Sequence, residues 1–239
     1  MQNMIDLHCH WIAGIDDGVR TPEDGLLLLS KLRSAGFATV VATPHMRPGM
    51  FDNDRDALEG AYVRMQSHLD TQRTNLPNVH LASEHYFDDV VFERIKNDAG
   101  LPYPGGHAVL IEFSPTVFPA RIGARLTDLK RRGLTTVVAH PERYQPVWED
   151  DRCLDELLDA GAHLLLDVCA VVGKYGRAAQ RAAEKLLEQE AYQAACSDAH
   201  KPQDVDTVVQ AIDRLTRLVG QKETERLLVL GPKSILDGA

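Results

Sequence analysis

The chain has 239 residues, of which 44% are hydrophobic and 26% charged, a composition typical of an α/β domain with a large core. Its formal net charge is −9 and no basic stripe is visible, so we expect no nucleic-acid partner. No stretch approaches the roughly 20 apolar residues that cross a membrane, and the first residues lack a signal-peptide pattern. We therefore expect a cytoplasmic protein without stable membrane insertion.

Short apolar runs alternate with amphipathic stretches along the whole chain, a pattern that predicts strands alternating with helices. The strands are expected at Met4–His8, Ala38–Thr43, Val79–Glu84, Ala108–Phe113, Thr135–His140, His163–Val168 and Ala194–Asp198. The helices are expected at Pro22–Ala35, Arg55–Arg73, Phe87–Asn97, Pro119–Arg132, Asp151–Ala160, Ala178–Glu190, Gln203–Val219 and Lys222–Leu228. Seven strands that alternate with helices favour parallel pairing through right-handed crossovers, in one domain over residues 1–239.

Side chains that bind metal ions follow six of the seven predicted strands, at the point where each strand ends. The segments are Asp6-Leu7-His8-Cys9-His10, Thr43-Pro44-His45, Ser83-Glu84-His85, Ile111-Glu112-Phe113, His140-Pro141-Glu142-Arg143 and Ser197-Asp198-Ala199-His200. In a parallel barrel the carboxyl ends of all strands meet at one face, where barrel enzymes place their active sites. Imidazole and carboxylate together suit Mn²⁺, Fe²⁺ and Zn²⁺. The pattern therefore predicts a metal pocket at that face.

Each of these features taken singly has a structural alternative. His8 and His10, two residues apart on a strand, face the same side, but core histidines often show this spacing. Glu112 in an apolar run must be paired, and a salt bridge to a helix would satisfy it as well as a metal ion. His45 and His140 could be ordinary core histidines. Only their joint position at strand ends favours the metal site.

The same segments resemble the signature of the PHP (polymerase and histidinol phosphatase) superfamily. Within it the chain is most similar to the bacterial metal-dependent protein-tyrosine phosphatases of capsule and exopolysaccharide synthesis. The closer match lies in Gly14-Ile15-Asp16-Asp17-Gly18, Arg47, Gly49-Met50-Phe51, Leu110-Ile111-Glu112-Phe113 and Ala139-His140-Pro141-Glu142-Arg143-Tyr144. The resemblance covers essentially the whole chain. It implies a single distorted (β/α)7 TIM-like barrel that binds three divalent metal ions, expected to be Mn²⁺, with iron or zinc as alternatives.

The resemblance also implies roles for individual residues. The three implied ligand sets are His8, His10, Glu84 and Asp198; then Glu84, Glu112 and His140; then Asp17, His45 and His200. Arg143, Asp198 and His140 are expected to be catalytic, with Arg143 holding the phosphate. Asp16, beside Asp17, is an alternative ligand. Two positions depart from the family pattern: no arginine follows His200, where Lys201 stands, and Asp167 replaces an asparagine.

These roles imply hydrolysis of a phosphoester by attack of a metal-bound hydroxide on phosphorus. The expected substrate is a phosphotyrosine-containing protein, in particular the tail of a bacterial tyrosine kinase, with Arg47, Tyr144, Lys174 and Tyr175 as further contacts near the mouth. None of the four cysteines lies in a phosphate-binding loop followed by arginine, so no cysteine nucleophile is expected. Three alternatives stay open: a small-molecule phosphatase such as histidinol phosphatase, a nuclease module, and a metal-binding regulatory barrel without turnover.

Overall fold

The computed structural model describes residues 1–69 and 75–238. Its strands are β1 (Met4–Cys9), β2 (Phe37–Ala42), β3 (His45–Met46), β4 (Asn78–Leu81), β5 (Glu84–Tyr86), β6 (Ala108–Glu112), β7 (Thr135–Ala139), β8 (His163–Asp167) and β9 (Tyr192–Cys196). Its α-helices are α1 (Pro22–Ala35), α2 (Arg55–Leu69), α3 (Asp89–Lys96), α4 (Ile122–Arg131), α5 (Gln145–Glu149), α6 (Asp155–Asp159), α7 (Gly176–Glu188), α8 (Asp204–Glu225) and α9 (Gly231–Asp237). Shorter helical turns are η2 (Pro141–Arg143), η3 (Asp151–Leu154), η4 (Val168–Val172) and η5 (Arg226–Leu230).

All strand pairs between these elements are parallel, in the orders β1-β2-β4 and β3-β5-β6-β7-β8-β9. The two groups join because β2 continues into β3 and β4 continues into β5. The first break falls at Thr43-Pro44, where proline lacks the N–H that a ladder needs, and the second falls at Ala82-Ser83. The expected third strand Val79–Glu84 is therefore two short strands, and the ring still has seven positions.

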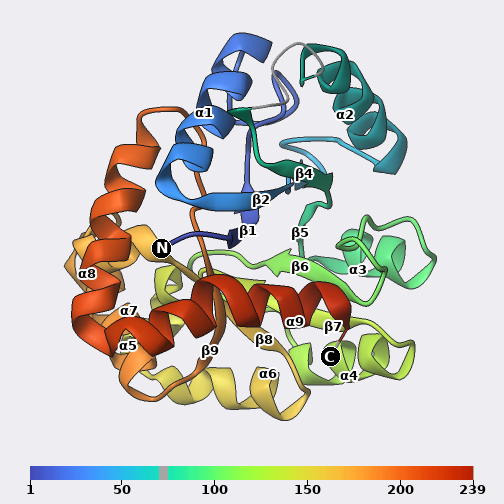
Figure 1. Cartoon of the computed structure of the whole chain (residues 1–239). Helices are drawn as coiled ribbons and strands as arrows, with labels where there is room; N and C mark the ends of the chain where they lie inside the picture. Colours follow the sequence, from blue (N-terminus) through green and yellow to red (C-terminus); the bar gives the residue numbers. More distant parts are fainter. Residues whose placement is uncertain (70–74, 239) are drawn as a thin grey trace.

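The ring closes between the last strand and the first. Beyond the end of β9, the Asp198 backbone N–H donates to the His8 carbonyl (3.0 Å), and the His10 N–H donates to the Ala199 carbonyl (2.9 Å). An isolated parallel bridge also joins Cys9 to Ala199. Seven parallel strand positions that close on themselves confirm the predicted (β/α)7 barrel, and Figure 1 shows the helices arranged around it.

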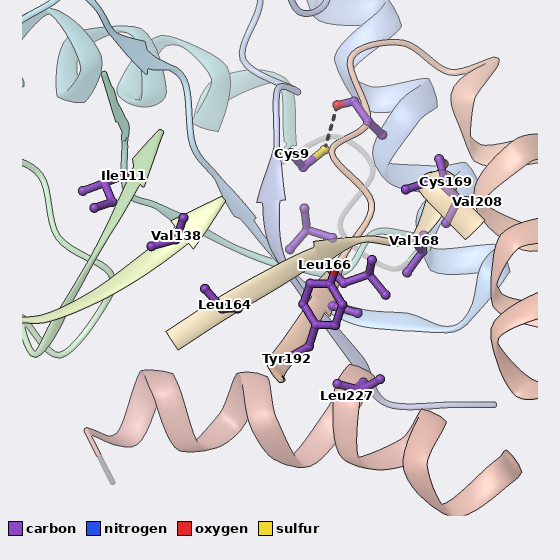
Figure 2. Packing of buried hydrophobic residues seen from close by; sticks show 14 of the residues in the cluster. Cys9, Ile111, Val138, Leu164, Leu166, Val168, Cys169, Tyr192, Val208 and Leu227 are labelled. Carbon is purple, nitrogen blue, oxygen red and sulfur yellow. Dashed lines mark hydrogen bonds between the residues drawn. The ribbon is translucent and has the colours of Figure 1, made fainter. Parts of the chain in front are cut away.

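Side chains on the strands alternate between the barrel interior and the layer of helices. Ile111, Val138 and Leu166 belong to the large outer cluster, which also contains Leu126 of α4 and Leu186 of α7. Figure 2 shows part of this cluster. Their neighbours Leu110, Val137 and Leu165 form the inner cluster. Glu112 and Asp167 lie two residues beyond Leu110 and Leu165, at the carboxyl ends of the strands. Because strand side chains alternate, they point to the same side as these inner residues.

The amino end of the barrel is filled by apolar side chains. Tyr103, which precedes β6, joins the inner cluster with Leu7, and so does Ile235 of α9. The Tyr103 hydroxyl donates to the Leu7 carbonyl at 2.9 Å, so its one polar group is satisfied. Neither α5 nor α9 was predicted from the sequence. Figure 1 shows α9, coloured red, lying across the strands.

Helix boundaries agree with the local signals in the sequence. Thr21 caps α1 by accepting from the Asp24 N–H, and Gly36 ends it at a φ of 109°. The last residues of the predicted helix Arg55–Arg73, at positions 70–73, lie outside the described residues. Gly220, at a φ of 82°, interrupts α8 where the two C-terminal helices were expected to meet. Among the described helices, none is long and apolar enough to cross a membrane.

Candidate metal centre

The structure brings the nine predicted metal-binding side chains together at the carboxyl ends of the strands. Among the described residues, their donor atoms form four groups, each spanning no more than 4.8 Å. The groups are His10, Asp17, His45 and His200; His8, His10 and Asp198; His8, Glu84 and His140; and His45, Glu84 and Glu112. Six elements or the loops that follow them contribute these residues: β1, β3, β5, β6, β7 and β9. That these nine residues hold ions stays a prediction.

Glu84 lies in the middle of this cluster. Its Oε1 is 3.3 Å from His8 Nε2 and 3.0 Å from His140 Nε2. Its Oε2 is 3.6 Å from His10 Nε2 and 3.1 Å from His45 Nδ1. One fully buried carboxylate therefore contacts four imidazoles from three different strand ends, β1, β3 and β7, the position that a bridging ligand between metal ions requires.

The groups differ in membership from the three ligand sets that the resemblance implies. His45 stands with Glu84 and Glu112, where the implied set has His140. His140 instead stands with His8 and Glu84. The cause is that Glu84 is within hydrogen-bonding or ion-pair distance of every one of these imidazoles, so side-chain proximity alone permits more than one partition.

Asp16 and Asp17 have separate positions although they are adjacent in sequence. Asp17 Oδ1 lies 3.4 Å from His45 Nε2 and 3.5 Å from His200 Nε2, so it faces the cluster. Asp16 instead accepts from His10 Nδ1 at 2.8 Å and from the His45 N–H at 3.1 Å. The next turn packs so closely that a Cβ on Gly18 would come within 2.3 Å of the His10 carbonyl. These contacts favour Asp17 as the predicted ligand and give Asp16 a position from which it orients His10.

Polar atoms without hydrogen-bond partners concentrate in the cluster, which is unusual for a folded interior. Eight such buried side-chain atoms occur in the described part of the chain, and six of them belong to predicted ligands. These six are His8 Nε2, His10 Nε2, His45 Nδ1, Glu112 Oε1, His140 Nδ1 and Asp198 Oδ1. A bound cation would take up these lone pairs. The donor set therefore fits divalent metal ions, which accept mixed imidazole and carboxylate ligands.

Several imidazoles of the cluster are held by a hydrogen bond through their Nδ1 atom. His8 Nδ1 is 2.5 Å from the Thr43 hydroxyl, and His200 Nδ1 is 3.0 Å from the Asp198 carbonyl. Together with the contact between His10 and Asp16, these bonds set the ring orientations, as outer partners do in metal sites. The sequence analysis missed Thr43, which gives only a weak signal as a threonine at a strand end.

Asp6 is a second residue that the sequence analysis did not assign. It is fully buried and accepts from the Ser197 backbone N–H at 2.9 Å and from the Ser197 hydroxyl at 2.5 Å. Burial raises the pKa of its carboxyl to about 6, against the lowering effect of these hydrogen bonds. A carboxylate two residues before His8 in an apolar strand was the available signal. Asp6 joins β1 to the loop that carries Asp198.

Charge compensation dominates the electrostatics of the cluster. Burial alone would lower the pKa of His45, but the Glu84, Asp17 and Glu112 carboxylates raise it to about 12. Burial would also lower the pKa of His200, but the contacts with Asp198 and Asp17 raise it to about 9. The same pairing holds the pKa of Glu84 well below its usual range despite burial. Protons thus occupy positions for which a cation would compete, so metal affinity should weaken in acid.

Backbone strain marks two of the predicted ligands. His140 has a φ of 37° and Asp198 a φ of 43°, in the left-handed region that favours glycine. Both residues follow directly or closely on the carboxyl end of a strand, β7 and β9. Such strain persists only where the surroundings enforce it, and it commonly occurs at functional sites.

A cavity of about 550 Å³ opens beside the cluster and is lined by Asp17, Asp198 and His200. Arg143 also lines it, as do Lys174, Tyr175, Lys201 and Arg20. Four basic side chains therefore line the cavity beside the predicted ligands, together with the acidic Asp24 and Asp204, and they supply positive charge for an anionic substrate. Tyr144 was expected near this mouth, but that expectation is wrong. Its side chain is 1% exposed and its hydroxyl donates to the Ala139 carbonyl at 2.9 Å, because the ring packs against Phe113 and Phe118.

The four cysteines are poor candidates for a nucleophile. Burial raises the pKa of Cys9 and Cys196 well above the usual thiol value, raises that of Cys169, and raises that of Cys153 to about 11. Thiols in such surroundings stay protonated at neutral pH, whereas reactive cysteines sit in places that lower their pKa.

Comparison with known proteins shows a match over nearly the whole chain. The family model described as "Capsular polysaccharide synthesis, CpsB/CapC" matches residues 4–237. The tyrosine-protein phosphatase CpsB of Streptococcus pneumoniae is 26% identical over 239 residues, covering 98% of each chain. The tyrosine-protein phosphatase YwqE of Bacillus subtilis is 26% identical over 197 residues, covering 82% of this chain and 77% of YwqE.

The fold also matches solved structures. A chain from the crystal structures of YwqE from Bacillus subtilis and CpsB from Streptococcus pneumoniae, described as unique metal-dependent tyrosine phosphatases, superposes with a TM-score of 0.88. The two chains are 25% identical, and the match covers 98% of this chain and 95% of the other. The phosphotriesterase homology protein from Escherichia coli, 12% identical, superposes with a TM-score of 0.57 and shares the fold alone.

Proposed function

The chain belongs to the capsular polysaccharide synthesis family CpsB/CapC, and we infer from this that it is a metal-dependent protein-tyrosine phosphatase. The family resemblance predicted from the sequence is thereby confirmed. The observation that carries the proposal is the cluster of nine imidazole and carboxylate side chains, six of whose buried donor atoms lack hydrogen-bond partners, beside a cavity that four basic side chains line.

The chain's own residues divide the work of phosphoester hydrolysis between ligation and substrate binding. His8, His10, Asp17, His45, Glu84, Glu112, His140, Asp198 and His200 would hold the ions, for which we propose three divalent cations, preferably Mn²⁺. When bound, such cations supply Lewis-acid chemistry, since they neutralise phosphate charge and acidify water. Arg143 lines the cavity and would bind phosphate oxygens through its fork of N–H donors.

The cavity suits a phosphate carried on an aromatic ring. Tyr175 presents a ring to the cavity, and Lys174 and Lys201 add positive charge at its edge. A tyrosine leaving group has a pKa near 10, so it departs with less protonation than an alkyl alcohol needs. Hydrolysis of a tyrosine phosphate therefore depends less on a general acid than hydrolysis of an alkyl phosphate does.

The proposed partner is a tyrosine-phosphorylated protein with an extended, accessible segment, such as the tail of a cytoplasmic bacterial tyrosine kinase. Most of the predicted ligands are buried, so the phosphate must enter the cavity to reach them. A flexible tail can place a single phosphotyrosine there, whereas a folded surface cannot without rearrangement. Binding would depend on the phosphate and ring more than on a wide docking surface.

The test of this proposal compares substrates on one metal-loaded preparation. We expect a phosphotyrosine peptide to be hydrolysed with a kcat/KM roughly 100-fold above that for histidinol phosphate, since the Arg143 and Tyr175 wall favours an aryl phosphate. Equal or better turnover of histidinol phosphate would contradict the tyrosine phosphatase assignment and favour a small-molecule phosphatase. Absence of turnover on either substrate, with metal ions bound, would favour a regulatory barrel.

A cysteine variant separates this chemistry from that of cysteine phosphatases. Cys153 is the most exposed of the four thiols, and Cys153→Ser should leave kcat/KM within about twofold of the parent, because no thiolate takes part. Loss of activity with metal content intact would argue for a thiol in the reaction. The same comparison applies to the buried Cys9, Cys169 and Cys196, one substitution at a time.

A further inference from the structure

Arg143 is held by carboxylates from two neighbouring strand ends. It lies on η2 after β7, and its Nη1 donates to Asp167 Oδ2 at 3.3 Å and to Asp198 Oδ2. Its side chain is 28% exposed, so it reaches the cavity while its inner side is buried against the two acids. The two carboxylates together raise the pKa of Arg143 despite burial, which keeps it charged.

The two acids are not equivalent. Asp198 Oδ1 faces His8 and His10 and belongs to the cluster of predicted ligands. Asp167 joins none of the four groups of potential ligands among the described residues. A cation bound to Asp198 would draw charge away from Arg143, because one carboxylate would then serve two positive partners. Asp167 is the carboxylate left to hold the guanidinium.

Asp167 is itself fixed in position. It is fully buried at the end of β8, and its Oδ1 accepts from the Cys169 N–H at 2.8 Å. Its own N–H donates to Glu142 Oε1 at 3.0 Å, and Glu142 Oε2 accepts from the Tyr192 hydroxyl at 2.9 Å. Of these two neighbours in sequence, Glu142 thus binds the backbone of Asp167 and Arg143 binds its side chain. Its carboxylate has little freedom to follow a moving partner.

Tyr175 supplies a third wall. Its ring centre lies 4.5 Å from the Arg143 guanidinium carbon, a stacking distance for cation–π contact. Its hydroxyl also lies close enough to the Asp167 carboxylate for each group to shift the pKa of the other. The guanidinium is therefore confined by Asp167 on one side and by the Tyr175 face on another, in a cavity otherwise open to substrate.

We propose that Asp167 and Tyr175 form a clamp that positions Arg143 for the phosphate of the substrate. This inference rests on the proposed phosphatase function and assigns Asp167 and Tyr175 as positioning residues of that site. A free arginine would lose rotamer freedom on binding phosphate, whereas a clamped one is already oriented. Asp167 and Tyr175 would hold Arg143 in place when a cation takes up the Asp198 carboxylate, to which Arg143 also donates.

Asp167→Asn tests the clamp with almost no change of shape. Asp167 uses its two oxygens for two different donors, the Cys169 N–H and Arg143, and asparagine has only one acceptor oxygen. We expect the KM for a phosphotyrosine peptide and the Kd of inorganic phosphate, measured by calorimetry on metal-loaded protein, each to rise about tenfold. The kcat should fall less than KM rises, and bound metal should not change. Asp150→Asn, at an exposed carboxylate paired with Arg152, is the matched control and should alter neither constant.

A double-mutant cycle shows whether Asp167 acts through Arg143. If it does, adding Asp167→Asn to Arg143→Ala should change the phosphate Kd by less than about twofold, because the positioned group is gone. Full additivity would overturn the proposal. So would an unchanged phosphate Kd in the single variant, or a rise that is explained by loss of bound metal.

Tyr175→Phe provides a second, milder variant if Asp167→Asn folds poorly. It removes only the hydroxyl that meets Asp167, and we expect the phosphate Kd to rise about two- to threefold. No change in the phosphate Kd would contradict the role of Tyr175. Phosphate binding decides these points without turnover. A parent protein that binds phosphate through the clamp but cleaves no phosphotyrosine would overturn the proposed function and leave the clamp standing.

Discussion

The two ends of the barrel are built from the same strands and differ in what their inward side chains contact. At the amino end, Tyr103 and Ile235 pack with Leu7 and Leu110, and the Tyr103 hydroxyl has its acceptor. At the carboxyl end, six buried donor atoms of predicted ligands lack hydrogen-bond partners. A well-satisfied plug stabilises the fold, whereas unsatisfied groups persist only where a ligand takes them up. The difference identifies the carboxyl end as the working end.

Two buried histidines show the same contrast at the scale of single residues. His85 has both ring nitrogens bonded to backbone, to the Leu110 carbonyl at 2.8 Å and the Leu101 N–H at 3.0 Å. Burial lowers the pKa of His85 to about 4, so the ring stays neutral. His45, also buried, contacts carboxylates that raise its pKa to about 12. Burial alone therefore does not distinguish a candidate ligand histidine from a structural one. The distinction comes from the partners of the ring, which are backbone groups for His85 and carboxylates for His45.

The largest effect is expected at the centre of the cluster. Glu84→Gln should lower kcat/KM by roughly three orders of magnitude and reduce bound metal, because the central carboxylate contacts four of the five predicted imidazole ligands. Metal analysis by mass spectrometry and steady-state kinetics check this outcome. Tyr103→Phe, at the other end, should retain both properties. Parent-like metal content and turnover in Glu84→Gln would break the contrast between the two ends.

The next effect separates phosphate binding from metal binding. Arg143→Ala should lower kcat/KM for a phosphotyrosine peptide about 100-fold while bound metal stays constant, because it removes a charged donor and no ligand. Kinetics and metal analysis on one preparation check it. If metal is lost together with activity, Arg143 stabilises the cluster and does not primarily bind substrate.

His85→Leu should have the opposite effect, with reduced stability and retained turnover. It removes the side-chain hydrogen bonds to the Leu110 carbonyl and the Leu101 N–H, so the free energy of unfolding should fall by about 2–4 kcal/mol. Urea denaturation measures the change. Turnover of the folded variant at saturating Mn²⁺ should stay within about twofold of the parent. A stable variant with lost turnover would place His85 in the working site.

The smallest effect concerns His163, which begins β8 at the amino end. Burial and then the Lys130 charge lower its pKa in the folded state below the usual value of 6.5. Above pH 6.5 both the folded and unfolded states hold it neutral. As pH falls below that, the unfolded state takes up the proton first and stability is lost. Urea midpoints should therefore drop between pH 7.5 and 5.5 by more in the parent than in His163→Gln. Equal drops would contradict the assignment.

Much of the fold could be predicted because it depends on local signals. Alternating apolar runs and helix boundaries such as Thr21 and Gly36 predicted seven strands and placed α1 correctly. The break of the second strand at Pro44 also had a signal, the missing N–H, that went unused. The short α5 and α9 were missed because a helix of five or seven residues shows less than two turns of periodicity.

The site could be predicted as a set of residues but not as a geometry. All nine predicted ligands come together because parallel strands bring their carboxyl ends to one face. Which imidazole stands beside which carboxylate depends on loop paths and strained backbone at His140 and Asp198. No periodicity encodes those features. The same holds for Thr43 and Asp167, whose roles depend on partners distant in sequence.

We propose that the cluster at the carboxyl end is a metal centre on which phosphate release depends. The most direct test strips the protein with a chelator, restores Mn²⁺, and measures bound metal and phosphotyrosine hydrolysis on the same samples. We expect the stripped protein to be inactive and its activity to return in proportion to bound Mn²⁺, up to three ions per chain. A stripped, metal-free protein that still hydrolyses phosphotyrosine at the original rate would contradict it.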